Sequence, residues 1–220
     1  MSKLSLYTYF RSSAAYRVRI ALSYKGLPYE SKMIHLLKNG GEENSAAYES
    51  INPQKMIPSL VDDGHIITQS LAIIEYIDEK YPEPGLLPVD LTHKAQVRSL
   101  ALAIACDIHP LNNLRVIRYL YKALRADEAK RNQWMLHWMN EGFSAIEKKL
   151  ASLNSKNYCY GRRVSLADLC LIPQVYNALR FDCDMRDFPR INQIYEHCMK
   201  QAEFIAASPE QQPDCDIRLD

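Results

Sequence analysis

The first hundred residues of this 220-residue chain contain no cysteine, and the six cysteines that follow form neither a CxxC pair nor a metal-site spacing. These absences exclude a dithiol redox site and a cysteine-bound metal, because both need thiolates at set spacings. A disulfide framework is also not expected in a chain long enough to bury a sizeable core. We therefore expect a reduced, cytoplasmic protein.

The chain also has little net charge and no long apolar run. Its 27 basic and 26 acidic residues give a net charge of +1, so no basic footprint points to nucleic acid. No stretch approaches the roughly 18 apolar residues of a membrane span, and the opening MSKLSLYTYF is too polar for a secretory signal. We expect no nucleic acid and no membrane among its partners, and instead a small molecule or another protein.

Strand and helix patterns alternate in the first part of the chain. The expected elements are a strand at 3–9, a helix from the paired serines to Gly26, a strand at 29–36, a short helix near 46–49, two strands joined at Asp63–Gly64, and a helix from Ser70 that Pro82 ends. This β-α-β-α-β-β-α order matches a thioredoxin-like domain, which we assign to residues 1–84.

The chain after the proline-rich segment PEPGLLPVD is helical nearly throughout. Helical periodicity runs through 93–107, 111–126, 128–152, 166–180 and 190–206. Within VSLADL, Ser165 and Asp168 have the spacing of a capping box, which we interpret as a folding feature. We therefore expect the fold class α/β plus all-α, with an all-helical second domain at residues 91–220.

The segment RSSAAYRVRIAL, residues 11–22, joins the first strand to the first helix, where a thioredoxin-like domain has its reactive site. It offers Ser12 and Ser13 but no cysteine, so a site that uses sulfur must receive it with the ligand. A helix N-terminus carries about half a positive charge and unpaired N–H groups. A hydroxyl beside that end would stabilise a bound thiolate, whereas a plain N-cap is the structural alternative.

Five blocks in order along the chain resemble the zeta class of soluble glutathione transferases. The blocks are RSSAAYRVRIAL, NPQKMIPSL, TQSLAIIEYI, CDIHPLNNLRV and SLADLCLIPQVYNALRF. The resemblance implies a homodimer in which glutathione binds the thioredoxin-like domain. The all-helical glutathione-transferase C-terminal domain would bind the substrate.

The activity implied by the resemblance is a glutathione-dependent cis–trans isomerisation of a small diacid. The thiolate would add to the cis double bond, permit rotation and leave again, so glutathione acts as a cofactor. Members of this class convert maleylacetoacetate to fumarylacetoacetate in tyrosine and phenylalanine catabolism. Two alternatives stay open: the same scaffold acting on maleylpyruvate or as a general glutathione transferase, and a non-enzymatic binding module.

The resemblance also implies which residues form the site. Ser12 is the activating hydroxyl, and arginines would hold the diacid because a guanidinium binds carboxylates through parallel hydrogen bonds. The implied catalytic residues are Ser12, Ser13, Arg11, Arg115 and Arg180. The residues implied to contact glutathione are Ser12, Ser13, Tyr16, Arg17, Ile57, Pro58, Gln69, Ser70, His109, Asn113 and Arg115.

Two of these segments carry specific expectations. The Ile57–Pro58 bond is expected to be cis, which would turn the main chain of Ile57 toward the cysteinyl part of glutathione. Gln69 and Ser70 would hold the γ-glutamyl end, whose carboxylate suits a helix N-terminus. A plain N-cap is the alternative for Ser70.

The sequence departs from the zeta pattern at three positions. Ala14 stands where the class commonly has cysteine, and Tyr16 replaces a tryptophan. Glu43 falls where relatives have glutamine, and we leave it out of the site because a carboxylate is a poor neighbour for the glycyl carboxylate of glutathione. Arg17 could equally be a structural ion-pair partner inside its helix.

Overall fold

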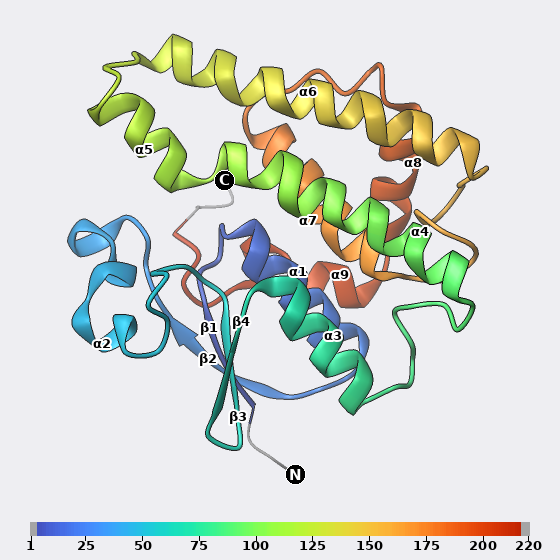
Figure 1. Cartoon of the computed structure of the whole chain (residues 1–220), viewed down its shortest axis with the longest axis horizontal. Helices are drawn as coiled ribbons and strands as arrows, with labels where there is room; N and C mark the ends of the chain where they lie inside the picture. Colours follow the sequence, from blue (N-terminus) through green and yellow to red (C-terminus); the bar gives the residue numbers. More distant parts are fainter. Residues whose placement is uncertain (1–3, 217–220) are drawn as a thin grey trace. The chain divides into compact units, whose positions relative to one another are not determined.

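The computed structural model describes residues 4–216 and divides into two compact units. Within the described residues, the first unit consists of 4–85 and 200–216, and the second is Leu86–Met199. This division differs from the predicted domains 1–84 and 91–220 at the C-terminal end. The reason is that helix α9 (Ala202–Ala207) packs on helix α1 (Ser13–Tyr24) of the first unit (Figure 1).

The first unit contains a four-stranded sheet in the order β2-β1-β3-β4. The strands are β1 (Leu4–Thr8), β2 (Tyr29–Met33), β3 (Ser59–Asp62) and β4 (His65–Thr68). β1 pairs parallel with β2 and antiparallel with β3, and β3 and β4 form the predicted hairpin. Its turn residues Asp63 and Gly64 have φ of +48° and +80°, as the tight turn of such a hairpin requires. The predicted thioredoxin-like order is confirmed.

Helix α1 begins and ends where the sequence predicts. Ser12 is its N-cap, and Gly26 lies just beyond its end with φ of +64°. The N–H of Gly26 donates to the carbonyl of Ser23 at 3.0 Å, and the N–H of Leu27 to that of Leu22 at 2.9 Å. This pair of bonds is a Schellman motif, which glycine at the left-handed position permits. The other helices before the linker are α2 (Ala46–Glu49) and α3 (Ser70–Lys80).

Lys25 ties the end of α1 to the residues that follow α3. Its ammonium donates to the carbonyls of Tyr81 and Pro84, both at 2.7 Å, and pairs with Asp78 at 2.8 Å. The side chain is fully shielded from solvent. All three N–H groups of the ammonium therefore have acceptors.

Replacing Lys25 with methionine is expected to lower the free energy of unfolding by about 3 kcal/mol, because the partly buried carboxylate of Asp78 and two carbonyls lose their cation. Urea unfolding measures the loss. The matched control is Lys148→Met, at an exposed position of helix α6 (Glu128–Ser152). Equal unfolding midpoints for the two variants would contradict the assignment.

The second unit is helical, as the sequence predicts. Its helices are α4 (Leu91–Leu102), α5 (Leu114–Lys122), α6, α7 (Leu166–Arg180) and α8 (Pro189–Cys198). α6 and α7 match their predicted ranges. The predicted single helix 190–206 is wrong, because the chain breaks between α8 and α9 at 199–201. Among residues 4–216, none of the helices has the length and apolar content to cross a membrane.

The capping box at the start of α7 is confirmed. Asp168 is fully buried and accepts hydrogen bonds from the N–H of Cys159 at 2.7 Å, the N–H of Ser165 at 2.8 Å and the Ser165 hydroxyl at 2.7 Å. Burial raises the pKa of the Asp168 carboxyl, although these bonds oppose the rise. The carboxylate is engaged in hydrogen bonds with nearby residues, which supports the interpretation of Asp168 as a folding residue.

Candidate active site

The sheet register brings three candidate segments to one end of the sheet. Tyr7 of β1 lies opposite Ser59 of β3, and Ser59 lies opposite Thr68 of β4. The residues after β1, before β3 and after β4 therefore meet at this end; they are 10–13, 57–58 and 69–70. The peptide bond before Pro58 is cis, so this expectation is confirmed.

Ser12 is a helix cap whose hydroxyl still has a proton to donate. Its Oγ accepts a hydrogen bond from the N–H of Ala15 at 3.2 Å. A serine hydroxyl has one donor and two acceptor sites, so the cap uses a lone pair and not the O–H. Ser12 is half-buried, whereas Ser13 is 7% exposed. The cap and a donor role at the same position are therefore compatible.

Ser70 is not the N-cap of α3, so the plain-cap interpretation of this residue is wrong. Gln69 occupies the cap position, with φ of +69° and ψ of +117°, and among residues 4–216 its side chain makes no capping hydrogen bond. Such backbone angles are unusual outside glycine and recur at functional sites. Ser70 Oγ instead accepts from Nη1 of the buried Arg17 at 3.3 Å. An exposed helix start beside a buried guanidinium suits an anion.

Tyr16 and Ile57 contribute to packing around these segments. The Tyr16 ring is 1% exposed, and its hydroxyl donates to the carbonyl of Phe204 in α9 at 3.3 Å. Ile57 is 8% exposed and belongs to an apolar cluster with Tyr9 and Phe10. The structure thus gives the Tyr16 side chain a structural contact with α9.

Arg19 shapes this region, although it is not among the predicted site residues. Its side chain is fully buried although it carries a charge. The guanidinium donates to four oxygens: the carbonyls of Ala207 at 2.9 Å, Phe10 at 3.0 Å and Tyr9 at 3.2 Å, and the hydroxyl of Thr8 at 3.1 Å. Arg19 therefore fixes the chain between β1 and α1. This role is not predictable from the residue type, because arginine is rarely buried to this extent.

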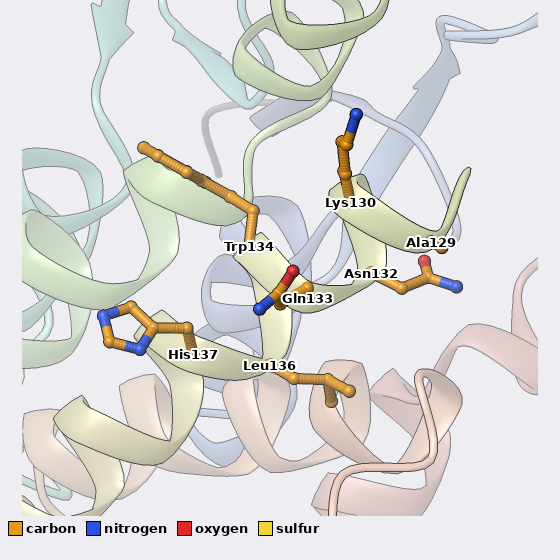
Figure 2. A pocket seen from close by; sticks show the side chains of 7 residues that line it. All are labelled: Ala129, Lys130, Asn132, Gln133, Trp134, Leu136 and His137. Carbon is orange, nitrogen blue, oxygen red and sulfur yellow. The ribbon is translucent and has the colours of Figure 1, made fainter. Parts of the chain in front are cut away.

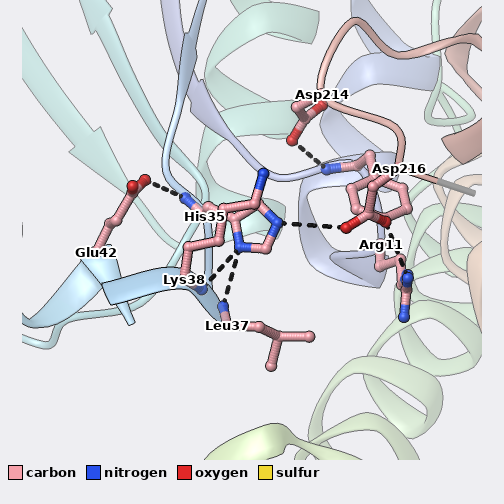
Figure 3. A network of polar contacts seen from close by, with 8 residues as sticks. Arg11, His35, Leu37, Lys38, Glu42, Asp214 and Asp216 are labelled. Atoms are coloured by element: carbon pink, nitrogen blue, oxygen red, sulfur yellow. Dashed lines mark hydrogen bonds and ion pairs between the residues drawn. The ribbon is translucent and has the colours of Figure 1, made fainter. Parts of the chain in front are cut away.

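Arg11 follows this fixed segment. Its guanidinium lies over the ring of Phe10, 4.8 Å from the centroid, and Nη2 donates to Oδ1 of Asp216 at 3.0 Å (Figure 3). The Arg11 side chain is 31% exposed. The arginine implied to hold a substrate carboxylate thus contacts a carboxylate of the chain's own C-terminal segment.

In the second unit, His109 opens a short turn that ends at the start of α5. A π-helical segment, Ala103–Ile108, directly precedes it, and π-helical segments recur at functional sites. Asn113 is the N-cap of α5, where its side-chain oxygen accepts from the N–H of Arg115 at 3.0 Å. This cap was not predicted, because the resemblance implies only a glutathione contact for Asn113.

Helix α6 positions the turn that carries His109. Nε1 of Trp134 donates to the carbonyl of Leu111 at 2.8 Å. A Cβ added to Gly142 would lie 2.3 Å from Cγ1 of Ile108. Glycine at this position is therefore what allows α6 to approach the residue before His109 so closely.

The two arginines implied for the second unit have exposed side chains. Arg115 lies in the first turn of α5, and Arg180 is the last residue of α7. The Arg180 guanidinium lies 4.7 Å from the centroid of the Phe181 ring. Exposure lets a dissolved carboxylate reach both guanidiniums.

A hollow of about 680 Å³ lies along α6, and Figure 2 shows the side chains that line it. Its lining residues are Ala129, Lys130, Asn132, Gln133, Trp134, Leu136 and His137. None of them is a predicted site residue. The hollow follows a single helix and is open to solvent, so it does not enclose a ligand.

Two family patterns match the chain. The pattern for the glutathione S-transferase N-terminal domain matches residues 6–85, and the pattern for the C-terminal domain matches residues 121–202. A Vibrio cholerae protein named probable maleylacetoacetate isomerase is 50% identical over 214 residues, which cover 97% of this chain and 99% of that relative.

Solved structures share the whole fold. The holo structure of a maleylpyruvate isomerase, described as a bacterial glutathione S-transferase of the zeta class, matches with a TM-score of 0.91 at 42% identity, covering 96% of this chain and 99% of that one. A maleylacetoacetate isomerase of Methylobacterium extorquens with bound malonate and glutathione matches with a TM-score of 0.92 at 34% identity, covering 97% and 100%. The predicted combination of a thioredoxin-like and a helical domain is confirmed.

Proposed function

Because the chain belongs to the zeta class of the glutathione S-transferase family, we propose that it is a glutathione-dependent isomerase that converts maleylacetoacetate to fumarylacetoacetate. The observation that carries this proposal is the 50% identity to a probable maleylacetoacetate isomerase over nearly the whole of both chains. Maleylpyruvate is the second candidate substrate, favoured by the likeness to a zeta-class maleylpyruvate isomerase.

The end of the sheet fits glutathione. The start of α3, with Ser70 at its first position and Arg17 beside it, suits the carboxylate of the γ-glutamyl end. Gln69, which is exposed, has its unusual backbone angles at this same helix start. The main chain of Ile57 would pair with the cysteinyl part. His109, Asn113 and Arg115 are further proposed contacts from the second unit.

Glutathione, when bound, supplies the thiol nucleophile for the cis double bond. Ser12 would donate its O–H to the sulfur, and the N-terminus of α1 would add its partial positive charge. Both effects favour the thiolate over the thiol. Ser13 is the second candidate donor, although it is 7% exposed.

Arginines would hold the diacid. Arg11, Arg115 and Arg180 would each bind a carboxylate or stabilise negative charge that develops next to it. The fixed backbone before Arg11, held by Arg19, limits the positions that its guanidinium can take. We also propose a cytoplasmic homodimer.

The test is the isomerisation rate of the purified full chain on maleylacetoacetate and on maleylpyruvate, with and without glutathione. We expect turnover only with glutathione, and faster turnover of maleylacetoacetate. S-methylglutathione, whose sulfur is blocked, is the matched control and should support no turnover. Binding of glutathione without turnover of either substrate would refute the isomerase and favour a transferase or a binding module.

A further inference from the structure

Residues 214–216, near the C-terminus, each make a contact beside the candidate active site, and Figure 3 shows those of Asp214 and Asp216. Oδ2 of Asp214 accepts from the N–H of Phe10 at 3.0 Å. Cys215 packs against the apolar cluster that contains Ile57. Asp216 then reaches Arg11 at 3.0 Å. The contacts of Asp214 and Cys215 hold the backbone near Arg11, whereas the Asp216 carboxylate itself is held only by surface contacts.

His35 provides a second contact for the Asp216 carboxylate. Nδ1 of His35 accepts from the N–H groups of Leu37 at 3.2 Å and Lys38 at 3.0 Å. In the neutral ring the proton is therefore on Nε2, which lies 3.7 Å from Oδ2 of Asp216 (Figure 3). Both carboxylate oxygens of Asp216 thus face donors, Arg11 on one side and His35 on the other.

The contact between Asp216 and Arg11 leaves part of the guanidinium unused. Only Nη2 donates to Asp216, and within residues 4–216 the buried Nε of Arg11 has no hydrogen-bond partner. A guanidinium binds a carboxylate best through two parallel bonds. The Asp216 side chain is also 44% exposed, so it can be displaced into water at little cost.

We propose that Asp216 is an internal carboxylate that occupies Arg11 until a substrate carboxylate displaces it, and that it thereby sets the affinity for diacids. This inference rests on the proposed function, because that function makes Arg11 a carboxylate-binding residue. A ligand carboxylate that accepts from two N–H groups of the guanidinium gains a bond that Asp216, which accepts from Nη2 alone, does not make. Asp216 therefore lowers the affinity for ligands that accept only one hydrogen bond from Arg11 more than it lowers the affinity for a well-oriented diacid.

The test measures malonate binding by calorimetry in the presence of glutathione, using the full-length wild type and Asp216→Asn. Malonate carries two carboxylates and requires no turnover. We expect Asp216→Asn to bind malonate roughly two- to fivefold more tightly, the range that an exposed ion pair allows. The KM for the isomerase substrate should fall by a similar factor with little change in kcat.

Two further variants separate this effect from general electrostatics. Asp63→Asn removes one exposed negative charge from the β3–β4 turn of the same unit and should leave malonate affinity unchanged. In an Arg11→Gln background, Asp216→Asn should have no further effect, since Asp216 acts through Arg11.

Unchanged or weaker malonate binding by Asp216→Asn would overturn the proposal, and so would equal tightening in the Arg11→Gln background. Failure of malonate to bind any variant would overturn it as well. A wild type that binds malonate but shows no glutathione-dependent turnover would instead refute the proposed function.

Discussion

Replacing Ser12 with glycine is expected to lower the isomerisation rate roughly 10- to 100-fold at neutral pH, because the sulfur of bound glutathione loses a hydrogen bond that favours its charged form. The pKa of that thiol then rises toward the ordinary value of about 8.5. Below this pKa the rate follows the thiolate fraction. The difference in rate between Ser12→Gly and the wild type should therefore shrink as the pH is raised. A pH profile of kcat/KM measures the shift in the thiol pKa.

Glycine is the informative substitution because it separates the two roles of Ser12. Loss of a serine N-cap costs about 1 kcal/mol with alanine but only a few tenths with glycine. Ser12→Ala and Ser12→Gly should therefore differ in stability and agree in activity. Ser12→Thr keeps both the hydroxyl and the cap, and should retain most of the rate. If Ser12→Gly turned over as fast as the wild type, the hydroxyl would be a cap alone.

Replacing Arg19 with methionine is expected to lower the free energy of unfolding by about 4–5 kcal/mol, since four buried oxygens lose their donors at once. The change also frees the chain between β1 and α1, so the folded fraction should lose isomerase activity. Denaturant unfolding followed by an activity assay at equal folded concentration measures both effects.

The control for Arg19 is Arg163→Met, at an exposed position, which should change stability by no more than about 0.5 kcal/mol. Arg19→Lys keeps the charge but has at most three N–H donors. It is the milder variant to measure if Arg19→Met does not accumulate as folded protein. Wild-type stability of Arg19→Lys and Arg19→Met together would contradict the role assigned to the guanidinium.

Elements that depend on local signals were predictable from the sequence. α6 and α7 have the predicted bounds because long apolar periodicity and a capping box act within a few residues of each helix end. The break between α8 and α9 carries no proline or glycine at 199–201 and was missed. It becomes necessary only because α9 packs on α1, which is a contact across nearly the whole chain.

The candidate site shows the same limit. Ser12, Ser70 and Ile57 lie in motifs that are readable along the sequence, and the sheet register brings their segments together. The burial of Arg19 and the approach of Asp216 to Arg11 depend on residues about 190 to 205 positions away. No local pattern encodes such a contact, so only the folded chain reveals it.

The docking of α9 on α1 has a consequence for synthesis of the chain. The sheet, α1 and α3 leave the ribosome first, but Tyr16 and Arg19 hydrogen-bond to carbonyls of Phe204 and Ala207. These acceptors emerge only after the second unit has been made. Although domains generally fold as units from the N-terminus, the first unit of this protein is completed last. A nascent chain that is interrupted before α9 would carry a thioredoxin-like domain in which the side of α1 that packs against α9 is uncovered.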